Sequence, residues 1–98
     1  MKIIPDPRVE KELNKLTPVD RTKVKEYIEL FKEYGFTLTA KYLKKVNSHV
    51  WELRPGDWRL FLLQVKPDFI IIYFMRKQSQ KMTKKTTKII EQRTKEYL

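Results

Sequence analysis

The stretch that decides the fold is residues 58–76, which read WRLFLLQVKPDFIIIYFMR. It contains two β-favouring runs, Trp58 to Val65 and Phe69 to Met75, and both are rich in aliphatic and aromatic side chains. Lys66-Pro67-Asp68 separates them, with proline at the second position of a predicted type I turn. A connection this short excludes a crossover helix, so the two runs predict an antiparallel hairpin.

A third run lies immediately upstream of this hairpin. Residues 50–54 alternate around Trp51 and Leu53, and Pro55-Gly56-Asp57 connects them to Trp58. Together the three runs predict an antiparallel meander. The middle run has few charges on either face, so we expect it to be the central strand.

The N-terminal part of the chain has helical rather than strand periodicity. Asp6-Pro7 predicts a capped helix start, and Thr17-Pro18 repeats the signal. Apolar residues then recur at helical spacing as far as Tyr34, and Gly35 can adopt the left-handed conformation that ends a helix. Residues 7–34 therefore predict a helical hairpin.

Three segments remain. Residues 1–4 predict a short strand or a loose end, and residues 36–48 are ambiguous between a turn of helix and an irregular link. Residues 79–98 predict a final helix with a weak apolar stripe on a basic body. The expected fold class is α+β: an N-terminal helical hairpin packed on a three- to four-stranded, mainly antiparallel sheet, with a C-terminal helix.

The charge of the chain is large and unevenly distributed. Its 98 residues, the length of one domain, include 22 Lys and Arg against 12 Asp and Glu, a formal net charge of +10. The excess lies after residue 40, so a nearly neutral scaffold is followed by a basic part. This segregation predicts a surface that faces phosphate.

Composition also excludes several kinds of site. The chain has no cysteine and a single histidine, His49. This excludes disulfides, a thiol nucleophile and a thiolate zinc site, and we expect neither a metal nor a cofactor. No apolar run approaches the length of a membrane span or the core of a signal peptide. We therefore expect a cytoplasmic protein without a membrane partner.

The cross-strand register predicts which side chains share a face. A first hairpin that closes over residues 55–58 places Arg54 opposite Arg59. A second hairpin that closes around Pro67-Asp68 places Arg59 opposite Arg76. Three arginines would then meet at one end of one face. Such a cluster either splays into water or holds an anion, and the sequence leaves both outcomes open.

The order of several motifs carries a resemblance to a known family. Trp51-Glu52-Leu53-Arg54 is followed by Trp58-Arg59-Leu60-Phe61 and then by Ile71 to Lys77. Lys41-Tyr42-Leu43-Lys44 precedes these motifs, and Gln78-Ser79-Gln80-Lys81 follows them. The pattern resembles the RelE/ParE toxin superfamily, and most closely its phage-derived, HigB-like branch. The resemblance runs from about residue 7 to the end of the chain.

This resemblance implies a single RelE/HigB-like toxin domain, residues 1–98, from a type II toxin–antitoxin system. It implies a metal-independent mRNA interferase that cuts mRNA on the 70S ribosome through attack of a ribose 2′-hydroxyl on the adjacent phosphorus. It also implies a cognate antitoxin of the helix-turn-helix, DNA-binding type. Two alternatives are a ParE-like toxin that inhibits DNA gyrase and a non-catalytic basic RNA- or DNA-binding module.

Candidate phosphate ligands follow from that chemistry. The planar fork of arginine grips phosphate oxygens and stays charged, so Arg54 and Arg59 are the first candidates. Arg76 and Lys77 come next. In-line attack also needs a proton acceptor and a proton donor.

Candidate proton-transfer groups are fewer. Lys44 is a possible base where neighbouring cations favour its neutral form. Glu52 is either a base or the partner that orients an arginine. We expect Tyr73 and Tyr97 to pack rather than to act on substrate.

A last set of residues is predicted to contact RNA without reading its sequence. Trp58, in a predicted turn, is the candidate for stacking on a base, while Trp51 is expected to pack against the helices. The predicted phosphate-contacting lysines are Lys41, Lys45, Lys81, Lys84, Lys85 and Lys88.

Overall fold

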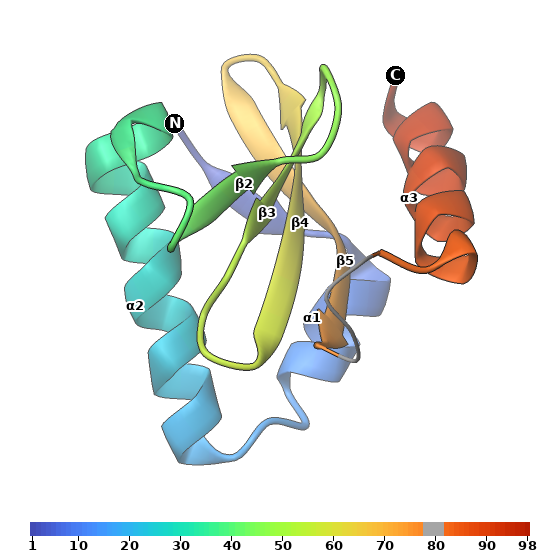
Figure 1. Cartoon of the computed structure of the whole chain (residues 1–98). Coiled ribbons are helices and arrows are strands. Elements are labelled where there is room, and N and C mark those ends of the chain that lie inside the picture. Colours follow the sequence, from blue (N-terminus) through green and yellow to red (C-terminus); the bar gives the residue numbers. More distant parts are fainter. Residues whose placement is uncertain (78–81) are drawn as a thin grey trace.

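The computed structural model describes residues 1–77 and 82–98 (Figure 1). Its elements, in chain order, are β1 (Ile3–Pro5), α1 (Pro7–Leu13), α2 (Pro18–Tyr34), the 3-10 helix η1 (Gly35–Thr37), β2 (Leu43–Lys45), β3 (Val50–Leu53), β4 (Trp58–Val65), β5 (Asp68–Arg76) and α3 (Lys84–Tyr97). The strands form one sheet in the order β1-β5-β4-β3-β2. The α+β class and the central place of β4 are confirmed. Within the described residues, no helix has the length and apolar character that crossing a membrane requires.

The sheet has five strands, which corrects the prediction of three to four. The additional strands, β1 and β2, have three residues each, too few for an alternating pattern to be read in the sequence. They pair at opposite edges of the sheet. β1 is parallel to β5, and β2 is antiparallel to β3. Their pairing therefore depends on long-range contacts rather than on local pattern.

The two N-terminal helices begin and end where their sequence signals predict. The Asp6 carboxylate accepts a hydrogen bond from the Arg8 backbone N–H at 2.8 Å and caps α1. The Thr17 hydroxyl accepts one from the Asp20 N–H at 3.2 Å and caps α2. Gly35 follows α2 with φ of 56°, a conformation that a side chain would disfavour.

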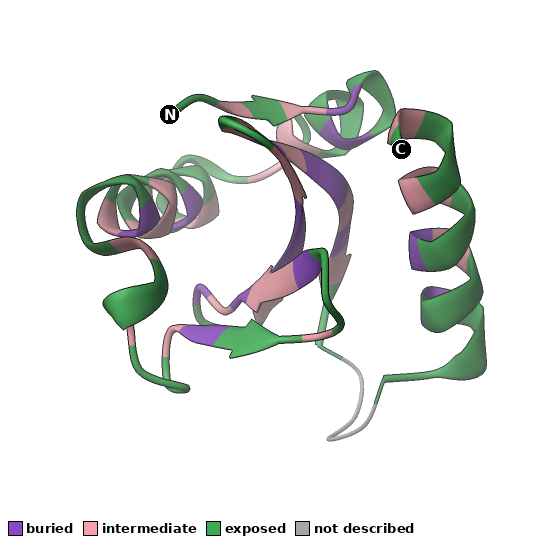
Figure 2. Ribbon diagram, turned by 90° about the horizontal axis from the view of Figure 1, so that it is seen from above, coloured by how far each residue is buried: buried purple, intermediate pink, exposed green. Residues whose placement is uncertain are grey.

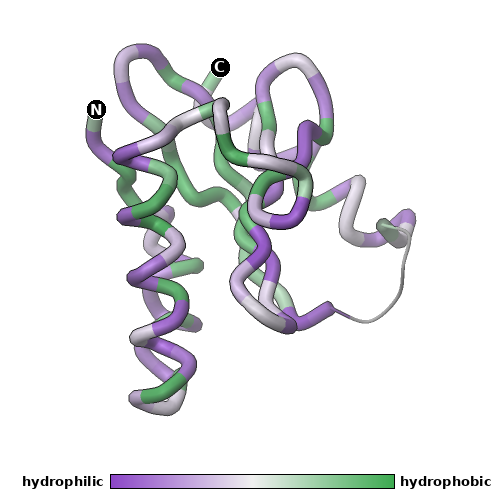
Figure 3. The backbone as a smooth tube through the Cα atoms, turned by 60° about the vertical axis from the view of Figure 1, so that its left-hand side comes forward, coloured by the Kyte–Doolittle hydropathy of each residue, from purple (hydrophilic) through white to green (hydrophobic). Residues whose placement is uncertain are grey.

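The sheet separates two apolar clusters (Figure 2). Phe31 of α2 and Leu62 of β4 belong to the cluster under α1 and α2, whereas Phe61 of β4 and Ile90 of α3 belong to the other. Adjacent residues of β4 thus enter different cores, as strand geometry requires. Figure 3 shows the hydrophobic residues concentrated in the sheet, with alternating hydrophilic and hydrophobic positions along α2. The expected packing of Trp51 on the helical side is confirmed.

The second hairpin differs from its predicted register. Val65 pairs with Asp68, so the turn encloses Lys66 and Pro67 and lies one residue earlier in the chain than a Lys66 to Phe69 pairing would place it. An irregularity between Phe61 and Leu62 then shifts the register again.

This shift decides which residues lie beside the first arginine of β4. Arg59 pairs with Met75, while Arg76 pairs with Trp58. The prediction that Arg59 and Arg76 share one face is therefore wrong, because a slip of one residue moves a side chain to the opposite face.

The C-terminal helix starts later than predicted. Thr83 is its cap, and the Thr83 hydroxyl accepts a hydrogen bond from the Thr86 N–H at 3.2 Å. Met82 and Thr83 are not helical, and residues 79–81 lie outside the described part of the chain. Ile90 is buried in the cluster beneath α3, and Tyr97 packs against that cluster. The apolar stripe is confirmed at these positions.

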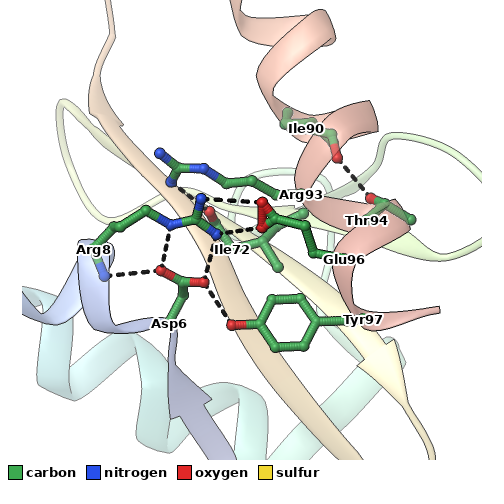
Figure 4. Close-up of polar contacts among 8 residues, drawn as sticks. All are labelled: Asp6, Arg8, Ile72, Ile90, Arg93, Thr94, Glu96 and Tyr97. Carbon is green, nitrogen blue, oxygen red and sulfur yellow. Dashed lines mark hydrogen bonds and ion pairs between the residues drawn. The ribbon is translucent and has the colours of Figure 1, made fainter.

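A polar network fastens the C-terminal end of α3 to the start of α1 (Figure 4). The Tyr97 hydroxyl donates to the buried Asp6 carboxylate at 2.5 Å. Arg8 bridges Asp6 at 2.8 Å and Glu96 at 2.7 Å. The Arg93 guanidinium also donates to the Ile72 carbonyl oxygen at 2.8 Å. Tyr97 therefore serves helix docking, as expected.

Candidate functional site: a cationic cavity between the sheet and α3

A cavity of about 450 Å³ lies between the sheet and the N-terminal part of α3, and we call it the α3 cavity. Its volume is within the range of small-ligand sites. Most of its charged lining comes from the sheet and its loops. These residues are Lys44, Lys45, Glu52, Arg54, Arg59 and Lys77, with Glu91 added from α3.

Arg59 supplies a fixed positive charge to this lining. Its side chain is only 8% exposed, and Nη1 donates to the carbonyl oxygens of Gly56 and Trp58, both at 2.7 Å. Burial lowers the pKa of Arg59, and the positive charge of Arg54 adds to that effect. Arginine nevertheless stays charged in proteins. The turn between β3 and β4 thus holds a guanidinium whose orientation is set before any ligand binds.

Glu52 of β3 and Arg54, which directly follows this strand, lie on the same side of the sheet, as strand alternation predicts. Arg54 Nε is 3.2 Å from Glu52 Oε1, and Arg54 Nη1 donates to the Ala40 carbonyl oxygen at 3.1 Å. The buried Nε–H makes no well-aligned hydrogen bond among the described residues, so charge attraction holds this pair. The geometry gives Glu52 the orienting role that was one of its two predicted roles.

Two lysines complete the cationic lining. Lys44 pairs with Glu52 across β2 and β3, which places it on the same face as Arg54. Lys77 follows β5, and its backbone N–H donates to the Asp57 carbonyl oxygen at 2.6 Å. This bond brings the end of β5 to the turn that carries Arg59. Side chains predicted from three separate motifs therefore meet in one cavity.

Arg76 and Trp58 lie on the other face of the sheet, outside the lining of the α3 cavity. The Trp58 ring stacks on Phe74 with centroids 4.8 Å apart, and the Arg76 guanidinium lies 5.3 Å from the Trp58 centroid. This arrangement is an aromatic stack covered by a cation. The structure thus separates Arg76 from the other catalytic candidates and packs Trp58 against the core cluster under α1 and α2.

The predicted RNA-contacting lysines occupy several positions. Lys45 lines the cavity, with Nζ 5.9 Å from the Trp51 centroid, whereas Lys41 lies outside it, 5.5 Å from the Tyr42 centroid. The lysines of α3 are exposed and are not part of the lining; they are Lys84, Lys85 and Lys88. Lys81 lies outside the described residues.

Sequence reasoning missed the contribution of α3 to the cavity. Thr83, Thr87, Ile90 and Glu91 all line it. Their spacing of four, seven and eight residues marks one face of a helix. This spacing is present in the sequence. It can be assigned to one helix face only when the start of the helix is known, and the cap at Thr83 defines that start.

Fold and site together define a small basic α+β protein whose sheet carries a cationic cavity beside its C-terminal helix. The family model described as "Phage derived protein Gp49-like (DUF891)" matches residues 11–95. The chain therefore belongs to the Gp49-like family of phage-derived proteins, a toxin-type family similar to RelE and HigB. No curated protein matches the chain significantly.

Proposed function

We propose that this protein is the toxin of a type II toxin–antitoxin system and acts as a ribosome-dependent mRNA endoribonuclease. Its membership of the Gp49-like family is consistent with a toxin. The observation that supports the catalytic part is the meeting of Arg54, Arg59 and Lys77 around one cavity. Three cations from separate segments can surround a single phosphodiester.

The proposed reaction is an internal transfer at phosphorus. The ribose 2′-hydroxyl attacks the adjacent phosphorus, the bond from phosphorus to the 5′-oxygen breaks, and a 2′,3′-cyclic phosphate and a 5′-hydroxyl result. Negative charge accumulates on the phosphoryl oxygens in the transition state. Arg59 is held by two carbonyl oxygens, so it can stabilise that charge without reorganising.

Proton transfer requires an acceptor for the 2′-hydroxyl proton and a donor for the leaving 5′-oxygen. Glu52 is held against Arg54, and the proposal assigns it to orientation. Lys44 on β2 and Glu91 on α3 both line the cavity. The proposal assigns proton transfer to these two groups.

The surrounding surface supports a polyanionic partner. Lys84, Lys85 and Lys88 are exposed on α3, and the chain carries a formal net charge of +10. Such lysines would contact ribosomal RNA through its backbone. The proposal includes action in the cytoplasm, where translating ribosomes are found. It also includes a cognate antitoxin of the helix-turn-helix type.

An in vitro translation reaction with mapping of mRNA 5′ ends tests this function. Wild type, Arg54→Ala and Arg59→Ala are compared with Arg76→Ala, whose side chain lies on the other face. We expect new 5′ ends with wild type and with Arg76→Ala. We expect cleavage at least about 100-fold slower in the other two variants, because each lacks one preorganised charge. Circular dichroism confirms that every variant is folded.

This experiment, together with assays of DNA integrity in cells and of RNA binding, separates the alternatives. Intact mRNA in translating reactions with the wild-type chain would refute the proposal. DNA breaks and stalled replication in cells with intact mRNA would indicate inhibition of gyrase instead. Salt-dependent RNA binding without any cleavage would indicate a non-catalytic module.

A further inference from the structure

Aromatic side chains reach the surface beside β2, at the edge of the sheet where the chain arrives from α2 and η1 (Figure 1). Phe36 of η1 is 53% exposed, although it is a large apolar residue. Its ring centroid lies 4.7 Å from that of Trp51 on β3 and 5.7 Å from that of Phe31 on α2. Trp51 is itself only partly buried. The aromatic cluster under α1 and α2 therefore continues outward to the solvent at this edge.

A second ring lies along the same edge. Tyr42 directly precedes β2, and its ring centroid is 5.6 Å from that of Tyr27 on α2. Tyr27 and Phe31 are four residues apart in this helix, a rise of about 6 Å. We call Phe36, Trp51 and Tyr42 the aromatic edge. Its two parts are separated by a distance similar to that between neighbouring nucleotides in an extended single strand.

A lysine covers a ring in each part of the aromatic edge. Lys41 Nζ lies 5.5 Å from the Tyr42 centroid, and Lys45 Nζ lies 5.9 Å from the Trp51 centroid. Both lysines are exposed, and neither forms an ion pair within residues 1–77 and 82–98. The contact of an exposed ammonium group with a ring is weak. Both cations are therefore available to an anionic ligand.

This combination of rings and cations fits a single-stranded nucleic acid. Phosphates attract lysines, and unpaired bases stack on aromatic side chains more strongly than an exposed ammonium group does. An acidic peptide would use the lysines alone, and a double helix hides the faces of its bases. A second copy of this chain is disfavoured, because its formal net charge is also +10.

We propose that the aromatic edge binds single-stranded RNA, with one base stacked at Phe36 and Trp51 and the neighbouring base stacked on Tyr42. Lys41 and Lys45 leave the rings that they cover in the free protein and contact the phosphates of these nucleotides. The inference goes beyond the proposed function, because binding at the aromatic edge does not require cleavage in the α3 cavity.

A fluorescence titration of the full-length chain tests this inference. Trp58→Phe leaves Trp51 as the only tryptophan. The probe is a 2′-O-methyl oligouridylate of about eight nucleotides, within the usual size of a single-strand site. It has no 2′-hydroxyl group that could attack phosphorus, so the result does not depend on the proposed ribonuclease. We expect the probe to quench Trp51 emission, and to do so equally when Arg59→Ala removes a cation from the α3 cavity.

Two further substitutions in this background test the stacking. Phe36→Leu keeps an apolar side chain but removes the ring, so the affinity for the probe should fall about tenfold. Tyr34→Leu is the matched control, since Tyr34 is 50% exposed and its ring pairs with no other ring in the described part of the chain. Its affinity for the probe should be unchanged. Circular dichroism confirms that both variants are folded.

The phosphate contacts are tested through salt dependence. Lys45 also lines the α3 cavity, so the test uses Lys41, which does not. Lys41→Ala should reduce the slope of log affinity against log salt concentration by about 0.7, the value for one phosphate contact on a single strand. Lys11→Ala removes the same charge from an exposed position on α1 and should leave the slope unchanged.

Four outcomes would overturn the inference. They are no quenching at millimolar probe, equal losses of affinity in Phe36→Leu and Tyr34→Leu, equal quenching by polyphosphate or polyglutamate of the same charge, and tighter binding of an oligothymidylate. The third outcome would indicate a surface for acidic polymers, including acidic proteins, and the fourth a site for single-stranded DNA.

Discussion

The two faces of the sheet are built from the same strands but covered differently. On one face, α1 and α2 close over an aromatic cluster in which Phe31 and Phe69 meet edge to face, with centroids 5.0 Å apart. On the other face, α3 covers only part of the sheet and leaves the α3 cavity beside a smaller apolar cluster. The comparison indicates that one face mainly stabilises the fold, and the other carries the charged residues that line the α3 cavity.

Two residues adjacent in sequence, Arg76 and Lys77, lie on different faces of the sheet. Arg76, at the end of β5, lies on the face covered by α1 and α2, where its guanidinium covers the Trp58 ring. Lys77 lines the α3 cavity on the other face. Two similar cations, adjacent in sequence, thus have different surroundings. Their difference depends on the hairpin register rather than on their chemistry.

The largest expected effect comes from opening the closed face. Phe31 is fully buried, so Phe31→Ala should lower the free energy of unfolding by about 4 kcal/mol, through lost apolar burial and the cavity left behind. Urea unfolding followed by circular dichroism measures it. Tyr34→Ala on the same helix removes a half-exposed ring and should cost less than about 1 kcal/mol. Equal losses of unfolding free energy in the two variants would contradict the conclusion that the aromatic cluster under α1 and α2 is closely packed.

The next effect separates the two neighbouring cations by activity. Lys77→Ala should slow mRNA cleavage in translation reactions by about 100-fold, equivalent to about 2.7 kcal/mol of barrier, because it removes a charge from the phosphate end of the cavity. Arg76→Ala should cleave at close to the wild-type rate. If the two variants lose activity equally, the faces do not divide the roles as described.

A smaller effect is expected at the polar anchor of α3. Tyr97→Phe removes the hydroxyl that donates to the buried Asp6 carboxylate and should cost about 1.5 kcal/mol in unfolding free energy. Thermal unfolding measures the loss, and Tyr34→Phe at an exposed position is the control. A variant as stable as wild type would show that this hydrogen bond does not hold the helix.

The same polar network makes the free energy of unfolding depend on pH. Hydrogen bonds from Arg8 hold the pKa of Asp6 well below its ordinary value, Tyr97 lowers it further, and burial opposes both. Because the folded-state pKa is depressed, this stabilisation is complete above about pH 4 and is lost as pH falls below that value. Wild type should therefore lose more stability than Asp6→Asn between pH 5 and pH 2. Parallel pH curves for the two proteins would exclude this linkage.

The smallest expected effect tests the turn that holds Arg59. Gly56 has φ of +59°, where a side chain is strained, so Gly56→Ala should cost about 1 kcal/mol in unfolding free energy. Its carbonyl oxygen accepts a hydrogen bond from Arg59, so cleavage should also slow. Asp57→Ala in the same turn should change stability by less than about 0.5 kcal/mol. A stable, fully active Gly56→Ala variant would show that this turn does not position the guanidinium.

Much of the fold was predictable because its signals are local. The caps at Asp6 and Thr17, the central strand and the Leu53 to Leu60 pairing all follow from short patterns. The charged half of the site was predictable for the same reason, since Glu52 and Arg54 lie two residues apart on one strand. The edge strands β1 and β2 were not, because three residues do not establish a period.

The sequence by itself determined the helices, the three-stranded meander and the placement of Arg54 opposite the start of β4, because these depend on local periodicity and on neighbouring turns. Only the tertiary structure decided that Lys77 rather than Arg76 joins Arg59, and that Glu91 and Thr87 face them from α3. The reason is physical: an irregularity in one strand pair changes the face of every later residue, and the docking of a distant helix leaves no local signal.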